Sequence, residues 1–396
     1  MPVFNPRSRR IRLDPDPAFE DAPLRRARED AVMGGWEGVR DLLARTGDDW
    51  PLRTHRITVL ANDSVGLEWP RAWSQAEPDR PDALVTAAYA EAARLHSLIL
   101  RRDRSVDDAA AARVVARCKA AAQAAPDDPA PWIGLLTLAG VLGDNGVSMV
   151  RWNELSFEAG ARSWGWFQEA VRRHPDSWHA HHRMREAQLS RLRTGSPRDL
   201  TGLLDFAAAA AAHAGRHSPL RVLPLYAHTE LRLAGTVGLL GAAERDWLTQ
   251  RNEQDLQDAH RDWFRGPERA HPAAPFDLNA LAYQLVESGR LGLAHPVFAA
   301  IGPYATATPW SQAAQRSGAR SAEDAFRAAR NLAESAAAKA PRNDTEPDPF
   351  PETAVPRPRR EAADDPADPD AAPALPASTP TSPDWTPPWQ TTTRSE

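Results

Sequence analysis

The histidines of this sequence are the side chains whose types and spacing come nearest to a chemical site. On a helix that begins at Trp178, a step of 100° per residue puts His179, His182, Arg183 and Glu186 on one arc. His182 and Glu186 are one turn apart, as two ligands of a metal ion would be. No third ligand is defined, however, and the His-Glu-x-x-His arrangement of a metalloprotease is absent. We therefore interpret the arc as a polar helix face that lines a groove, in preference to a metal site.

A second pair, His228 and Glu230, follows about one helical unit later. The two residues are two positions apart, so they point to different sides of one helix. If neighbouring helices bring this pair to His182, a structural hydrogen bond between histidine and carboxylate is the simpler interpretation. The alternative is an enzyme or metal-dependent sensor centred on His182, Glu186 and His228, which requires these side chains to converge in a pocket.

The remaining sequence contains no catalytic motif that we can identify. A Ser-centred elbow, a Walker loop and a paired-glycine dinucleotide motif are all missing. Cys118 is the only cysteine, which excludes an intrachain disulfide and makes a Cys-based zinc site implausible. Its Ala-rich surroundings predict a buried structural thiol. We expect no enzyme activity, no metal and no cofactor.

Composition indicates which elements must position these residues. The 396 residues are rich in alanine and poor in β-branched types, and no convincing run places Val, Ile, Thr or Tyr with period two. Alanine loses no side-chain entropy in a helix, whereas Val, Ile and Thr do. The sequence therefore predicts an all-α fold.

Charge and hydropathy exclude several classes of function. A net charge of -5 argues against a general nucleic-acid-binding role, which needs a concentrated basic surface. The apolar stretches at 135–142 and 207–212 are too short to span a bilayer, and no apolar region follows the basic run at 7–12. We expect a cytoplasmic protein that binds neither nucleic acid nor membrane.

Proline–aspartate junctions divide the chain into helical units. Three of them, at 77–82, 125–132 and 174–178, combine a Pro that ends one helix with an Asp or Ser that caps the next. Weaker junctions lie at 46–51 and 215–219. Helix–turn–helix units that recur about every 48 residues are typical of an α-solenoid.

Three regions follow from this pattern. We predict a flexible N-terminal segment at 1–19, a helical-repeat domain at 20–340 and a disordered, acidic, Pro-rich tail at 341–396. The tail holds 14 of the 36 prolines, and so few apolar residues that burial cannot offset its ordering entropy.

One unit matches a known repeat. Its first helix carries Leu278, Ala282 and Leu285, Gly289 makes the turn, and Ala294 and Phe298 follow in the second helix. This spacing resembles the tetratricopeptide repeat, although Leu278 and Ile301 depart from the usual residues. Phe167, Ala170 and Pro175 match the second half of another repeat. The resemblance implies a concave groove, with Asn279 and Tyr283 facing it.

A second resemblance covers more of the chain. The segments at 180–184, 195–196, 206–207, 218–220, 227–230, 299–302 and 309–310 are similar to an uncharacterised bacterial family of tetratricopeptide-like proteins. Members carry Lys-Trp-Gly-Gly-Ser where this chain has Arg193-Thr194-Gly195-Ser196. The family implies no activity for the chain.

An interaction scaffold is therefore the function we expect from the sequence. A stack of helical hairpins leaves an extended concave face that suits a peptide or a partner domain. The residues that we place on this partner-binding groove are His179, His182, Arg183, Glu186, Asn279 and Tyr283.

Overall fold

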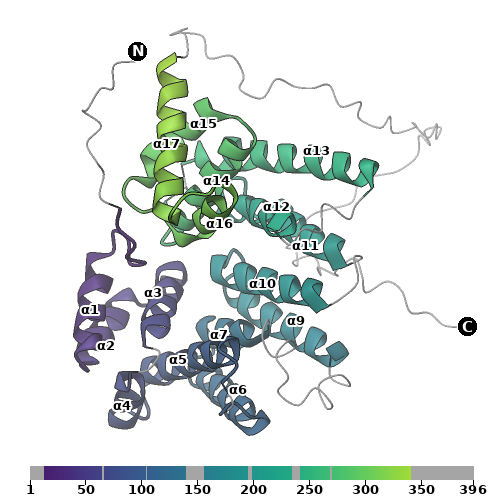
Figure 1. Ribbon diagram of the computed structural model, residues 1–396. Helices are drawn as coiled ribbons and strands as arrows, with labels where there is room; N and C mark the ends of the chain where they lie inside the picture. The colour runs from purple at the N-terminus through teal and green to yellow at the C-terminus, as the bar shows by residue number, and fades with distance from the viewer. Residues whose placement is uncertain are drawn as a thin grey trace, which may run out of the picture. The chain divides into compact units, whose positions relative to one another are not determined.

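The computed structural model confirms the all-α class. It describes residues 13–64, 67–103, 105–139, 156–194, 199–233, 241–267 and 270–339, which are helical with short connections and contain no strand (Figure 1). None of the helices in these ranges has the length and apolar character needed to cross a membrane. The tail predicted at 341–396 lies outside the described residues.

Helices follow one another along the whole described chain. In the first part they are α1 (Ala22–Val32), α2 (Glu37–Thr46), α3 (Trp50–Asp63), α4 (Trp69–Ala76), α5 (Pro81–Leu100), α6 (Asp108–Ala124), α7 (Ala130–Ala139) and α9 (Ser156–Arg173). Then come α10 (Trp178–Thr194), α11 (Asp199–His213), the short 3-10 helix η1 (Pro219–Val222), α12 (Leu223–Leu233), α13 (Ala242–Asp258) and its π-helical continuation η3 (Ala259–Phe264). The last four are α14 (Ala274–Glu287), α15 (Leu291–Ile301), α16 (Ala307–Ser317) and α17 (Ala322–Lys339).

All five predicted junctions lie between helices, and their chemistry explains why. The Asp49 carboxylate accepts from the backbone N–H of Leu52 at the start of α3, at 3.1 Å. Asp128 caps α7, and Ser177 caps α10, by accepting from backbone N–H groups two and three residues later. Each cap satisfies a donor that the first helical turn leaves without a partner.

Helices pack mainly on those next to them or next but one along the chain. α10 contacts α7 and α9 on one side and α11 and α12 on the other (Figure 1). Buried side chains form two clusters that meet at α12, where Leu223 belongs to the first and Leu225 to the second. Contact between neighbours is what a helical array produces.

The N-terminal segment joins the beginning of the described chain to its last helices. The backbone N–H of Asp14 donates to the carbonyl oxygen of Pro303 at 2.8 Å. The Phe19 ring meets Phe276 and Tyr304 edge-on, with centroids 5.1 and 5.6 Å apart. An open solenoid has no such contact, because each repeat touches only its neighbours. The solenoid arrangement therefore stays a prediction.

The same contacts correct the prediction of a flexible segment at 1–19. Within its described part, Ala18 is 1% exposed and Phe19 is 6% exposed. The Asp16 carboxylate accepts from Arg25 Nε at 2.9 Å and also pairs with Arg28. The buried Phe19 ring and these ion pairs hold residues 13–19 in place.

The repeat unit predicted at residues 278–298 forms the expected helical hairpin. α14 and α15 pack together, and Gly289 has a φ of +72° in the turn between them. Side chains with a Cβ rarely adopt this backbone conformation, which explains the glycine. The predicted core positions are all buried, namely Leu278, Ala282, Leu285, Ala294 and Phe298.

Candidate functional site

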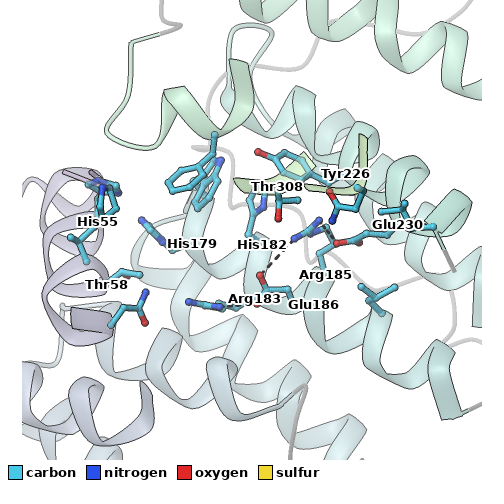
Figure 2. Close-up of a pocket in the computed structure, with 18 of the residues that line it drawn as sticks. His55, Thr58, His179, His182, Arg183, Arg185, Glu186, Tyr226, Glu230 and Thr308 are labelled. Carbon is cyan, nitrogen blue, oxygen red and sulfur yellow. Dashed lines mark hydrogen bonds and ion pairs between the residues drawn. The ribbon is translucent and has the colours of Figure 1, made fainter. Parts of the chain in front are cut away.

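A pocket of about 920 Å³ lies between α3, α10 and α12, with further lining from α14, α16 and the N-terminal segment (Figure 2). All four residues of the predicted arc, His179, His182, Arg183 and Glu186, line it. Helix α10 presents this arc because its opposite, apolar face is fixed in the core. Ala180, Met184 and Ala187 are each no more than 1% exposed.

Aromatic rings form one wall of the pocket. The His182 imidazole stacks on Trp178, with the ring centroids 3.8 Å apart and an interplanar angle of 23°. Tyr226 of α12 meets the same imidazole edge-on at 4.6 Å. Phe276 at the start of α14 lies against Trp178, at 5.9 Å. These rings offer broad apolar contact beside polar atoms.

A buried carboxylate holds this wall in position. Asp277 is fully buried and accepts from Trp178 Nε1 at 2.9 Å and from the Tyr226 hydroxyl at 2.9 Å. Tyr226 donates to Oδ1, whereas Trp178 donates to Oδ2, and His271 Nε2 lies 3.0 Å from that same Oδ2. Burial, together with the negative charge of Asp277, raises the pKa of Tyr226 well above 10, so the phenol remains a donor. Asp277 thus links α10, α12 and α14.

Charged groups in the pocket are already paired. Arg183 Nη1 donates to Glu186 Oε2 at 2.8 Å, and Arg185 Nη1 donates to Glu230 Oε1 at 2.7 Å (Figure 2). Arg185 also lies 3.7 Å from Glu186 and stands over the Tyr226 ring. Burial raises the pKa of Glu186, but the two arginines outweigh it and leave that pKa below the ordinary value. The arginines and glutamates therefore stay ionised, and their opposite charges balance within each pair.

Three imidazoles in the pocket are uncharged at neutral pH. His55 of α3 and His179 of α10 face each other, with ring centroids 5.7 Å apart (Figure 2). Burial lowers the pKa of His55 to about 4 and puts the pKa values of His179 and His182 well below 6.5. Within the described structure, the Nε2 atoms of His179 and His182 are buried without a hydrogen-bond partner. Burying such an atom without a hydrogen-bond partner costs its desolvation free energy.

The alternative centre of His182, Glu186 and His228 is not assembled. His228 Nε2 lies 2.8 Å from Asp255 Oδ2 and joins α12 to α13, away from the residues that line the pocket. Glu186 instead forms ion pairs with Arg183 and Arg185 of α10. Among the described residues, no group of three or more His, Cys, Asp or Glu side chains could hold a metal ion. Glu230 of α12 lines the pocket, whereas His228, two positions earlier on the same helix, does not.

Two residues assigned to the groove lie elsewhere, and that prediction is wrong. Asn279 is 0% exposed and Tyr283 is 2% exposed. Asn279 donates to the carbonyl of Tyr304 at 2.8 Å and accepts from Trp310 Nε1 at 2.7 Å. The Tyr283 ring packs edge-on against Trp310. Helix α16 covers the face of α14 that a tetratricopeptide array would leave open.

Other pocket residues were missed by the reasoning from sequence. His55 lies in α3, where residues 53–61 are all buried although positions 53–56 are polar. Four polar residues in a row gave no signal that they would be buried. Arg185 lies beside the predicted arc rather than on it. Tyr226 carried one weak signal, because the chain has only four tyrosines.

Cys118 is a buried structural thiol, as predicted. It is 0% exposed, and its Sγ lies 3.6 Å from the carbonyl oxygen of Ala88. Burial raises the pKa of the thiol to about 12, which leaves no reactive thiolate near neutral pH.

Comparison with known proteins identifies no relative of this chain. No family model, no curated protein and no solved structure gives a significant match. The likeness to tetratricopeptide proteins and to the uncharacterised bacterial family therefore rests on the quoted residues and stays a prediction.

Proposed function

We propose that this chain is a non-catalytic binding protein that holds an extended segment of a partner polypeptide in the pocket along α10. The observation that carries the proposal is the pocket itself, which has a volume of about 920 Å³ and combines aromatic faces with buried imidazoles that need partners. Ligand-binding sites in proteins are typically pockets of this size that are mostly apolar and contain a few convergent polar groups.

The dimensions of the pocket favour an extended chain. Trp178 and Leu189 both line it, so it follows α10 over 11 helical steps (189 minus 178). At about 1.5 Å per step, that length is about 16 Å. An extended polypeptide advances about 3.3 Å per residue, so about five residues fit along the helix. Each of them brings one backbone donor and one acceptor to the polar wall.

The electrostatics favour binding over catalysis. A general base works best when its pKa lies near the working pH. The pKa of Glu186 is lowered by its arginines, and the pKa values of His179 and His182 lie far below neutrality. These groups therefore accept protons poorly at pH 7, whereas all of them can take part in hydrogen bonds.

Site-specific photocrosslinking tests the proposal. A benzophenone amino acid placed at Leu189, inside the pocket, is expected to crosslink a polypeptide in cells that make the protein, and mass spectrometry would locate the attached segment. The matched control carries the same group at Trp247, which is 48% exposed on α13. If both positions capture the same species, or position 189 captures no polypeptide, the proposal fails.

A further inference from the structure

Every charged side chain among the described residues that line the pocket has an oppositely charged partner. Arg183 is paired with Glu186, and Arg185 is paired with Glu230. The remaining carboxylate of the lining, Asp63, is paired with Arg28 of α1 outside it. A ligand carboxylate would have to displace a glutamate from its arginine, and an ammonium would have to displace an arginine. Either exchange breaks a short hydrogen bond in a partly dehydrated site.

Most of the lining atoms that lack a partner belong to neutral groups. They are both ring nitrogens of His55, Nε2 of His179, Nε2 of His182 and Oε1 of Gln312, each buried and without a hydrogen-bond partner in the described structure. A charged exception is Nε of Arg185, whose guanidinium already donates from Nη1 to Glu230. His179 and His182 come from consecutive turns of α10, His55 comes from α3 and Gln312 from α16, and all four residues line the pocket. A ligand that completes their hydrogen bonds removes a cost that the empty pocket carries.

A carboxamide is the side-chain group that fits this set best. An imidazole Nε2 is a donor in one tautomer and an acceptor in the other, and an amide oxygen accepts only. A carboxamide offers two N–H donors and one carbonyl acceptor, so it can pair with either histidine tautomer and with Gln312. A hydroxyl has one donor, and a carboxylate has none.

We propose that the segment bound along α10 is uncharged and presents Asn or Gln side chains to His179, His182 and Gln312. The apolar parts of the same segment pack on Trp178 and Tyr226. This inference rests on the proposed function, because it names the chemistry of the polypeptide that the pocket holds.

A positional-scanning library of capped pentapeptides tests the ligand class. Sublibraries that fix Gln, Glu, Lys or Leu at each position are immobilised, and the retained full-length protein is measured. Gln sublibraries are expected to retain at least about ten times more protein than the matched Glu, Lys and Leu sublibraries. A larger signal from Glu or Lys overturns the ligand class but leaves the proposed function standing. If no sublibrary retains the protein, both fall.

Variants locate the preference in the pocket. The double variant His179→Ala and His182→Ala is expected to lose the Gln preference, whereas His181→Ala should keep it. His181 is a matched control, because it is a buried histidine of the same helix that does not line the pocket. If the double variant does not fold, Gln312→Leu at the half-buried α16 position makes the same test. A Gln preference that survives in every folded variant overturns the assignment.

One further variant reverses the selectivity. Glu186→Gln removes the carboxylate that Arg183 pairs with and that lies near Arg185. The freed positive charge is expected to raise retention on the Glu sublibraries about ten-fold. Unchanged retention on those sublibraries would mean that the ion pairs do not set the charge preference.

Discussion

Arg53 of α3 donates from Nε to Oδ2 of Asp128, 75 residues later in the chain, at 2.8 Å. Its Nη2 reaches Asp82 at 2.7 Å. Both carboxylates come from the Pro–Asp junctions that divide the helices, so one guanidinium ties two turns together. Arg53 is 5% exposed and Asp128 is 2% exposed. Burial lowers the pKa of Arg53, but the attraction of Asp128 outweighs it and the net pKa is raised, which keeps the cluster ionised.

Removal of Arg53 should therefore destabilise the fold strongly. Arg53→Met leaves two carboxylates without their cation, and breaking a buried pair in this way costs about 3–5 kcal/mol. Urea unfolding followed by circular dichroism measures the loss. Arg117→Met is the control, because Arg117 pairs with Glu91 with a side chain that is 57% exposed, and such pairs contribute less than about 1 kcal/mol. Equal losses in the two variants would contradict the role of the cluster.

Most of the local structure could be predicted because its causes are local. A Pro that ends a helix and an Asp that caps the next act within a few residues, and the junctions at 46–51, 77–82 and 125–132 all lie between helices. The apolar stripe and polar arc of α10 follow from helical periodicity alone. Both signals need no knowledge of the distant chain.

The site could be predicted only in part, because most of it depends on distant contacts. The arc of α10 was identified, but its partner His55 lies more than 120 residues earlier and meets it only through the packing of α3 on α10. Asn279 and Tyr283 were misplaced because helix α16 covers them. A repeat pattern fixes the register of one helical hairpin, but it does not specify what packs against it.

The buried position of Asn279 changes what its substitution should do. Asn279→Ala leaves Trp310 Nε1 and the Tyr304 carbonyl without their partner, at a cost of about 1–3 kcal/mol for buried groups. Thermal unfolding measures this loss. Gln250→Ala, at an exposed position of α13, should change stability by no more than about 0.5 kcal/mol. If Asn279→Ala is as mild as that control, Asn279 lies on an open face after all.

The contact of the N-terminal segment with the last helices predicts an effect far from Phe19. Phe19→Ala removes a buried ring that packs on His55, Phe276 and Tyr304, which should cost about 3–5 kcal/mol. His55 should also react faster with diethylpyrocarbonate, because the ring that covers it is gone. Met33→Ala, at a position that is 86% exposed, should change neither property. Unchanged His55 reactivity in Phe19→Ala would mean that the ring does not shield this histidine.

Acidification should destabilise the protein through its buried histidines. Burial lowers the folded-state pKa of His55 and of His181 to about 4 from 6.5. As the pH falls through this window the unfolded chain binds protons first, so their contribution is complete above about pH 6.5 and is lost toward pH 4. A shift of about 2.5 units amounts to about 3 kcal/mol for each histidine. Urea unfolding at about pH 7.5 and about pH 5 measures the difference in stability between wild type and His55→Gln. That difference should shrink or change sign at the lower pH, because the variant has no imidazole at position 55 to titrate. A difference that is equal at both values would show that His55 is not held neutral by the fold.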